Sequence, residues 1–298
     1  MTATLHHFAD DAAPAGRLAT ALGVAARAIA LHRFPDGEHR VTVAETDETA
    51  ILHCGLADPD ARLVMLLLAG DALRDRGARR LVLVAPYLPY MRQDIAFHPG
   101  EAVAQRVIGR LLASAFDAVL TVDPHLHRTP DLAAVLPGAQ AITISAAPCL
   151  AAALQKRLPH GTLLVGPDAE SRPWVEAMAA PLGLDCLVAQ KQRHGDRAVT
   201  ITIPDIDRAA GRPVLLVDDM LSSGGTMIAC AAQLRAAGAV VAGAAVTHCL
   251  ASPDDLARLA TAGIAPLIAC DSVAGPAATV ALAPALAAAL RDHGLIRR

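Results

Sequence analysis

Short aliphatic runs, each ending at a turn or a polar residue, recur along the whole chain. Runs of about four to eight apolar residues bounded by turn signals are typical of strands buried on both faces of a parallel sheet. We therefore predict strands at residues 50–53, 81–84, 118–122, 162–165, 184–188, 214–217 and 240–246.

Alanine-rich segments with helical periodicity separate most of these runs, most clearly at residues 63–77, 100–116 and 227–238. This alternation predicts an α/β fold of mainly parallel sheets flanked by helices, with binding sites at the carboxyl ends of the strands. The pattern divides into two similar halves, 1–145 and 146–298, and the last segment can pack back onto the first half. The stretches 80–87 and 212–219 are candidates for equivalent strands of the two halves.

Composition supports two domains, since 298 residues with 54% hydrophobic content can build a large core. A net charge of −3 predicts no nucleic-acid or membrane partner, so any phosphate binding must be local. The six cysteines form no Cys-x-x-Cys pair and the first residues do not resemble a signal peptide, so we expect a cytoplasmic protein. Residues 272–290 are uncharged but contain glycine and prolines, which favours a buried connection and a helix over a membrane span.

The most informative stretch follows the predicted strand 214–217, where two carboxylates precede a loop of small residues and a helix. Glycines let backbone N–H groups turn inward, hydroxyls add donors, and the helix N-terminus favours an anion, so a phosphate monoester fits there. The carboxylates would repel phosphate and are suited to ribose hydroxyls or to a bridging cation. The alternative is an ordinary acidic turn before a helix. The residues are Asp218, Asp219, Ser222, Ser223, Gly224, Gly225 and Thr226.

Two further motifs suit a nucleotide. Residues 34–38 form a predicted hairpin turn in which Phe34 can stack on a base and the carboxylates of Asp36 and Glu38 can accept hydrogen bonds. Arg92 and Gln93 follow the buried strand 81–84 and can contact phosphates or a base, although a surface arginine closing a loop is an equal alternative.

Three other groups are candidates for metal binding or catalysis. Asp123, His125 and His127 lie after strand 118–122, and in an extended segment they project to one side, as a metal site requires. The alternative is a hydrogen-bonded histidine pair at a helix entrance. Asp168 follows strand 162–165 and can serve a metal or a sugar. Residues 190–197 form a predicted basic loop at a hairpin tip between strands 184–189 and 198–203, in which solvated and catalytic lysines cannot be told apart.

Taken in order, these motifs resemble the ribose-phosphate pyrophosphokinase family over residues 15 to 290. The resemblance implies two phosphoribosyltransferase-like domains, one for ATP and one for ribose 5-phosphate, with Mg²⁺ and a homo-oligomer whose neighbouring subunit completes the ATP site. It implies ATP binding by Phe34, Asp36, Gly37, Glu38, Arg92 and Gln93; metal binding by His125 and Asp168; ribose 5-phosphate binding by Arg193, Asp218, Asp219, Ser222, Ser223, Gly224, Gly225 and Thr226; and catalysis by Lys191 and Arg193.

The implied reaction transfers the pyrophosphoryl group of ATP to the 1-hydroxyl of ribose 5-phosphate. Ser222 and Ser223 stand where the family usually has Asp-Thr, and Glu170 replaces a customary glycine, which indicates a divergent branch. The alternatives are a non-catalytic regulatory homologue, a type I phosphoribosyltransferase, which has no use for a second nucleotide site, and a zinc hydrolase, for which further ligands are missing.

Overall fold

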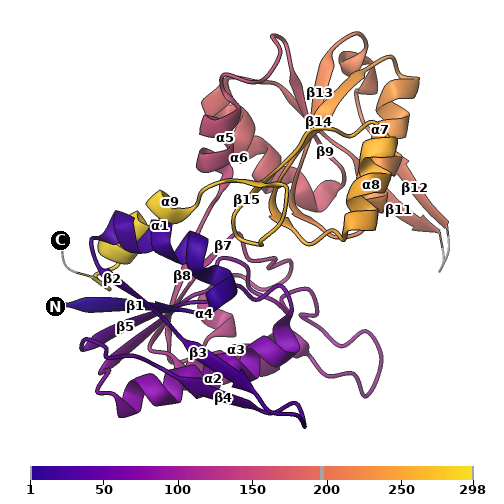
Figure 1. Ribbon diagram of the computed structural model, residues 1–298. Helices are drawn as coiled ribbons and strands as arrows, with labels where there is room; N and C mark the ends of the chain where they lie inside the picture. The colour runs from indigo at the N-terminus through magenta and orange to yellow at the C-terminus, as the bar shows by residue number, and fades with distance from the viewer. Residues whose placement is uncertain (1, 195–197, 297–298) are drawn as a thin grey trace. The chain divides into compact units, whose positions relative to one another are not determined.

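The computed structural model describes residues 2–194 and 198–296, and for residues 191–194 and 198–200 it describes the backbone alone. The chain divides into two compact units, which are Met1–Ser145 with Ala281–Arg298, and Ala146–Val280. Each unit is built on a six-stranded parallel sheet with helices on both faces (Figure 1). The predicted α/β class with mainly parallel sheets is confirmed.

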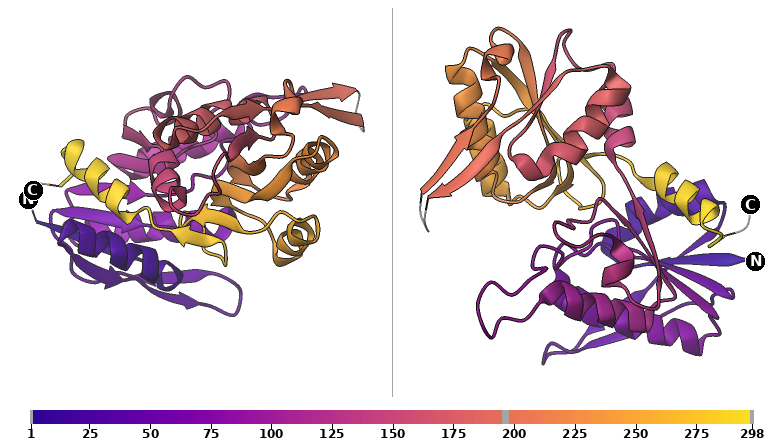
Figure 2. Two further views of the ribbon diagram at one scale, coloured as in Figure 1. Left: turned by 90° about the horizontal axis from the view of Figure 1, so that it is seen from above. Right: turned by 180° about the vertical axis from the view of Figure 1, so that it is seen from behind.

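The first unit has the strand order β2-β1-β5-β6-β7-β8. Helices α1 and α9 cover one face of the sheet and α2 and α3 cover the other, as the views in Figure 2 also show. An antiparallel hairpin, β3–β4, packs on α2. The bounds are β1 Ala3–His7, β2 Ala25–Ala28, β3 Ala30–Arg33, β4 His39–Thr42, β5 Thr49–His53, β6 Arg80–Val84, β7 Ala118–Val122 and β8 Gln140–Ile144, with the 3₁₀ turn η1 Ala9–Asp11 and helices α1 Ala12–Leu22, α2 Pro59–Asp75, α3 Ala104–Ala115, α4 Leu132–Val135 and α9 Ala283–Asp292.

The second unit has the strand order β10-β9-β13-β14-β15-β16. Helices α5 and α6 lie on one face of its sheet and α7 and α8 on the other (Figure 1). The bounds are β9 Leu163–Gly166, β10 Cys186–Val188, β11 Gln190–His194, β12 Ala198–Thr202, β13 Pro213–Leu221, β14 Val240–Cys249, β15 Leu267–Cys270 and β16 Ala278–Val280, with 3₁₀ turns η2 Ala169–Ser171 and η3 Ile206–Ala209 and helices α5 Ala147–Leu154, α6 Arg172–Leu182, α7 Gly225–Ala236 and α8 Pro253–Thr261.

The central strands form because their aliphatic runs can be covered on both faces. Residues 81–84 of β6 are completely buried, and residues 214–217 of β13 are at most 3% exposed. Two of the helices that flank the sheets end at glycines in the left-handed region, Gly23 after α1 and Gly183 after α6, where a residue without Cβ closes the last turn at little cost. In the described part of the chain, no helix combines the length and the apolar character that a bilayer span requires.

The two units repeat the same order of elements. In each unit the first strand leads into a 3₁₀ turn and a helix, and the second strand leads into an antiparallel hairpin. The third strand of the sheet then pairs with the first, on the side opposite the second. The predicted equivalence of stretches 80–87 and 212–219 is wrong, because β6 is fourth in its sheet and β13 is third. All central strands are aliphatic, so their composition does not fix their position.

Two segments are more extended than the sequence predicted. Strand β13 continues past residue 217 to Leu221, because it keeps pairing with β14 as far as Cys249. The basic stretch 190–197 is not only a loop, since five of its residues form β11 and pair with β12. Backbone pairing of this kind does not depend on apolar side chains. A prediction from hydrophobicity alone therefore misses the polar residues at which these strands continue.

Candidate active site

The junction between β13 and α7 is a tight turn in the second unit. Ser222, Ser223 and Gly224 connect the strand to the helix, and both serines are exposed. Gly224 has φ 74°, and a Cβ there would lie 3.0 Å from Cδ2 of Leu259. A residue with a side chain at this position would therefore have a strained backbone, and its Cβ would be too close to Leu259 of α8.

The helix that follows begins without a capping side chain. Its N-cap residue is Gly224, and a helix N-terminus that is not capped in this way favours an anion near its first N–H groups. A Cβ at Gly225 would meet only Oγ of Ser223, at 4.0 Å. The space beside Gly225 is open, and the half-buried Thr226 adds a hydroxyl in the first turn.

Three carboxylates gather near this junction. Oδ1 of Asp218 accepts a hydrogen bond from the backbone N–H of Asp219 at 3.0 Å, and Asp219 is only 2% exposed. Burial raises the pKa of Asp218 well above its usual value, and the charges of Asp219 and Asp168 raise this pKa further. Oδ1 of Asp168 also accepts from the N–H of Glu170 at 3.1 Å and of Ser171 at 3.3 Å. Such a cluster suits a divalent cation or a ligand rich in hydroxyl groups.

In the first unit, the loops after β6 and β7 are fastened together. Asp94, whose side chain is 1% exposed, accepts from the N–H of Arg128 at 3.1 Å and from its guanidinium at 2.9 Å. Oε1 of Gln105 accepts from the hydroxyl of Thr129 at 2.7 Å. Sequence reasoning missed this clamp, because its two pairs of partners are 34 and 24 positions apart and no local pattern joins them.

The clamp holds candidate ligands of a nucleotide on one edge of the sheet. Arg92 is exposed and Gln93 is half-buried in the loop after β6, and His125 lies in the loop after β7, the neighbouring parallel strand. The carboxyl ends of neighbouring parallel strands meet at one edge, which brings these two loops together.

The prediction of an extended Asp123-x-His125-x-His127 face is wrong. Strand β7 ends at Val122, and Asp123 has φ 38°, in the left-handed region, so the chain turns before the histidines. The two imidazoles nevertheless come together, with Nε2 of His127 in hydrogen-bond contact with Nε2 of His125. Their ring centroids are 3.8 Å apart and the ring planes meet at 87°.

The predicted hairpin at residues 34–38 is confirmed as the turn between β3 and β4. The N–H of Phe34 donates to the carbonyl of Glu38 at 2.8 Å, Glu38 N–H donates to Oδ1 of Asp36 at 3.1 Å, and Gly37 has φ 98°. The Phe34 side chain is exposed, and the Arg40 guanidinium carbon is 6.0 Å from its ring centroid. An exposed ring beside carboxylates can stack on a base, so the adenine role stays a prediction.

The remaining candidates, Lys191 and Arg193, belong to β11, and their side chains lie outside the described residues. The β11–β12 hairpin follows the second strand of its sheet, as the β3–β4 hairpin does in the first unit. The two basic residues therefore occupy the same place in the repeat as the hairpin that carries Phe34.

Similarity to known proteins decides the family. Residues 8–115 match the N-terminal domain of ribose phosphate pyrophosphokinase, and residues 149–259 match the phosphoribosyl transferase domain. The chain is 36% identical over 279 residues to a ribose-phosphate pyrophosphokinase of Methanopyrus kandleri, covering 93% of this chain and 94% of that protein. The chain belongs to the ribose-phosphate pyrophosphokinase family. A relative from Halobacterium salinarum is 34% identical, with 93% of this chain and 96% of that protein covered.

The fold agrees with this assignment. The crystal structure of phosphoribosylpyrophosphate synthetase from Mycobacterium smegmatis superposes with a TM-score of 0.80 at 23% sequence identity, covering 97% of this chain and 98% of that one. The predicted family and the two predicted phosphoribosyltransferase-like domains are confirmed.

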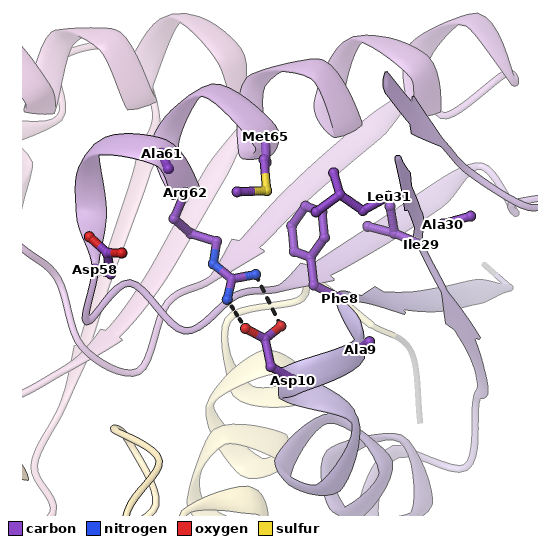
Figure 3. Close-up of a pocket in the computed structure, with 10 residues that line it drawn as sticks. All are labelled: Phe8, Ala9, Asp10, Ile29, Ala30, Leu31, Asp58, Ala61, Arg62 and Met65. Atoms are coloured by element: carbon purple, nitrogen blue, oxygen red, sulfur yellow. Dashed lines mark hydrogen bonds and ion pairs between the residues drawn. The ribbon is translucent and has the colours of Figure 1, made fainter. Parts of the chain in front are cut away.

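The first unit of this family member has a pocket at the position that corresponds to the β13–α7 turn of the second unit. About 570 Å³ in volume, it is lined from η1, from the start of β3 and from the first turns of α2 (Figure 3). Arg62 donates to both carboxylate oxygens of Asp10, one at 3.1 Å, and its guanidinium carbon is 5.2 Å from the Phe8 ring centroid. This ion pair lowers the pKa of Asp10.

The loop after β5 explains why this pocket differs from its counterpart. It reads Cys-Gly-Leu-Ala-Asp at residues 54–58, without the serines and the glycine pair of residues 222–225. The apolar wall of Phe8, Leu31 and Met65 offers no donor to a phosphate. The repeat therefore retains the position of the pocket, while the loop after β5 lacks the serines and the glycine pair of the β13–α7 turn.

Proposed function

We propose that the chain transfers the pyrophosphoryl group of Mg-ATP to the 1-hydroxyl of ribose 5-phosphate, giving phosphoribosyl pyrophosphate and AMP. The observation that carries this proposal is the phosphate turn at residues 222–226, beside three carboxylates, in a chain that matches ribose-phosphate pyrophosphokinases over 93% of its length. In this assignment residues 1–145 form the ATP domain, with the last segment, 281–298, packed on it, and residues 146–280 form the ribose 5-phosphate domain.

On the sugar side, the turn binds the 5-phosphate. The amides of Gly224 and Gly225 and the hydroxyls of Ser222, Ser223 and Thr226 are the donors, and the N-terminus of α7 favours the negative charge. Asp218 and Asp219 accept hydrogen bonds from the ribose hydroxyls, and Arg193 is assigned to the sugar phosphate by the family resemblance.

On the nucleotide side, Arg92 and Gln93 bind ATP from the clamped loop after β6. Phe34, Asp36, Gly37 and Glu38 contact the adenine of a neighbouring protomer, so the active form is a homo-oligomer. The exposure of Phe34 at the end of its own hairpin supports a role toward a partner.

The residues present fit a divalent cation, because burial, together with the neighbouring charges of Asp219 and Asp168, raises the pKa of Asp218, and a bound cation would offset these clustered carboxylates. His125 of the first unit and Asp168 of the second unit are each proposed to bind Mg²⁺. When bound, Mg²⁺ neutralises phosphate charge.

For the reaction, the ribose O1 forms a bond to the β-phosphorus, the bond from that phosphorus to the α–β bridging oxygen breaks, and the hydroxyl proton leaves to solvent. AMP departs with the bridging oxygen. A loose phosphoryl-transfer transition state mainly needs alignment and charge stabilisation, which Lys191 and Arg193 supply. A metabolic enzyme with these substrates is expected in the cytoplasm.

The test is to incubate the protein with MgCl₂, ATP and ribose 5-phosphate and to identify the nucleotide product. AMP together with phosphoribosyl pyrophosphate supports the proposal. ADP would indicate a simple kinase, and the absence of turnover with intact ligand binding would indicate a regulatory homologue; either result contradicts the proposal.

Replacing Lys191 tests the catalytic assignment. Lys191→Ala should lower turnover on the order of 10³-fold or more, because it removes a cation that stabilises transition-state charge, while ATP affinity stays within a few-fold. The matched control is Lys156→Ala, since Lys156 is the other lysine of the chain and is exposed. Full activity in Lys191→Ala would show that the catalytic cation is elsewhere.

A further inference from the structure

We propose that His125 and His127 together form a two-imidazole site for a transition-metal ion such as Mn²⁺, Co²⁺ or Zn²⁺, in preference to Mg²⁺. The inference rests on the proposed metal role of His125, and it adds a second ligand, His127, and the class of metal.

The geometry of the two rings carries the inference. Their Nε2 atoms face one another in direct contact, the centroids are 3.8 Å apart, and the planes meet at 87°. A metal bound to two imidazoles at about 2.0–2.1 Å from each nitrogen needs those nitrogens about 3 Å apart, so a small rotation of the side chains makes room for the ion.

The backbone around the pair is anchored on both sides. The N–H of Asp123 donates to the carbonyl of Ile144 at 3.0 Å, and the N–H of Leu126 donates to the carbonyl of Pro124 at 2.8 Å. After the pair, Arg128 is held by the buried carboxylate of Asp94 through bonds of 3.1 and 2.9 Å. The histidines therefore approach each other on a fixed turn, which reduces the ordering that metal binding requires.

The chemistry of the donor atoms selects the metal. Mg²⁺ is a hard ion that prefers oxygen ligands and keeps several of its waters, whereas imidazole nitrogen suits Mn²⁺, Co²⁺ and Zn²⁺ increasingly well. One imidazole among water and phosphate oxygens is compatible with Mg²⁺. Two imidazoles from one turn replace a second oxygen ligand by nitrogen and shift the preference to the transition metals.

The inference is tested on the full chain without substrates. CoCl₂ is titrated into the protein, and binding is followed by visible absorption and calorimetry. We expect one Co²⁺ per chain that a large excess of MgCl₂ does not displace. His127→Asn should weaken Co²⁺ binding by about tenfold or more, because even changes outside the direct ligands cost that much in metal sites.

The controls separate a specific site from surface binding and misfolding. His160→Asn removes an exposed histidine of the second unit and should leave Co²⁺ affinity unchanged. His127→Ser is a second variant for which the same loss is expected, and thermal unfolding shows that both variants fold. Wild-type affinity for Co²⁺ in folded His127→Asn and His127→Ser, or equal competition by Mg²⁺, would overturn the inference.

The metal titration tests the two-imidazole site and the product assay tests the proposed function, so either hypothesis can be contradicted without the other. If the protein makes AMP with Mg²⁺ but binds no Co²⁺ at this pair, the two-imidazole site is wrong and the proposed function stands. If Co²⁺ binding depends on His127 but no AMP forms, the site is supported and the proposed function is wrong.

Discussion

At the scale of single residues, the first unit contains histidines that are buried as neutral groups. His53 ends β5 and is 2% exposed, and among the described residues its Nδ1 has no hydrogen-bond partner. Burial, followed by the charges of His7 and Arg17, lowers the pKa of His53 to about 4. Burial is also the main reason that the pKa of His6 falls to about 4.

This burial predicts a loss of stability in acid. In the unfolded chain His53 titrates near 6.5, so the unfolded state binds a proton below that pH. In the folded state His53 does not bind this proton until the pH approaches 4, so the proton stabilises the unfolded state between these pH values. Between pH 7 and pH 5, His53 should lower the free energy of unfolding by about 2 kcal/mol. The measurement is urea unfolding at both pH values for wild type and His53→Gln.

The comparison between the two proteins isolates the histidine, since the other titrating groups are common to both. The variant should lose less stability on acidification than the wild type, and His160→Gln, which changes an exposed histidine, should not differ from wild type. An unchanged pH dependence in His53→Gln would show that the side chain is hydrated or protonated in the folded state.

Among the secondary-structure elements, the β13–α7 turn contains two glycines with different roles, since one is required by the backbone and the other leaves room for a ligand. Gly224→Ala should destabilise the protein by about 1–2 kcal/mol, because φ is 74° and the new Cβ would contact Leu259 at 3.0 Å. Gly225→Ala should unfold like wild type, because its Cβ would meet only Ser223 Oγ at 4.0 Å.

At Gly225, an alanine should change substrate binding and leave stability unchanged. A methyl group in the open space beside the first turn of α7 is expected to weaken ribose 5-phosphate binding without changing the denaturation midpoint. Calorimetry and urea unfolding of the two alanine variants give both values. Equal stability of Gly224→Ala and Gly225→Ala would contradict the strained turn.

At the scale of the whole molecule, the end of the chain stabilises the first unit. Helix α9 packs on α1, with Leu286 and Leu290 at most 2% exposed. The guanidinium of Arg291 donates to the carbonyl of Ala21 at 2.5 Å, and that of Arg80 donates to the carbonyl of Gly294 at 3.0 Å.

Removal of residues 283–298 should therefore destabilise the first unit by at least about 3 kcal/mol, since two buried leucines alone contribute about 1.5–3 kcal/mol each. Hydrogen exchange is expected to rise in β1 and α1 of the truncated chain, while β13 and β14 stay protected. Arg291→Ala, which keeps the apolar contacts, should lose only about 1 kcal/mol. Unchanged exchange in β1 and α1 after truncation would rule out this stabilising role.

The central strands and long helices were predictable because burial on both faces requires aliphatic runs and because helices repeat with a fixed period. Strands β1 and β2 escaped prediction. The first contains His6 and His7, which are polar although buried, and the second, Ala25–Ala28, is short and exposed. The proposed phosphate turn could be located in the sequence because its serines and glycines are contiguous, as the donors of a single anion site must be.

The class of fold and the family could be inferred from the sequence alone, and so could the position of the proposed phosphate turn, since these depend on local periodicity and on motifs of adjacent residues. Only the tertiary structure decided the position of each strand in its sheet, the Asp94–Arg128 clamp, the contact of His125 with His127 and the gathering of Asp168 with Asp218. Sheet pairing and charge interaction act between residues far apart along the chain, and no local pattern records which of them will meet.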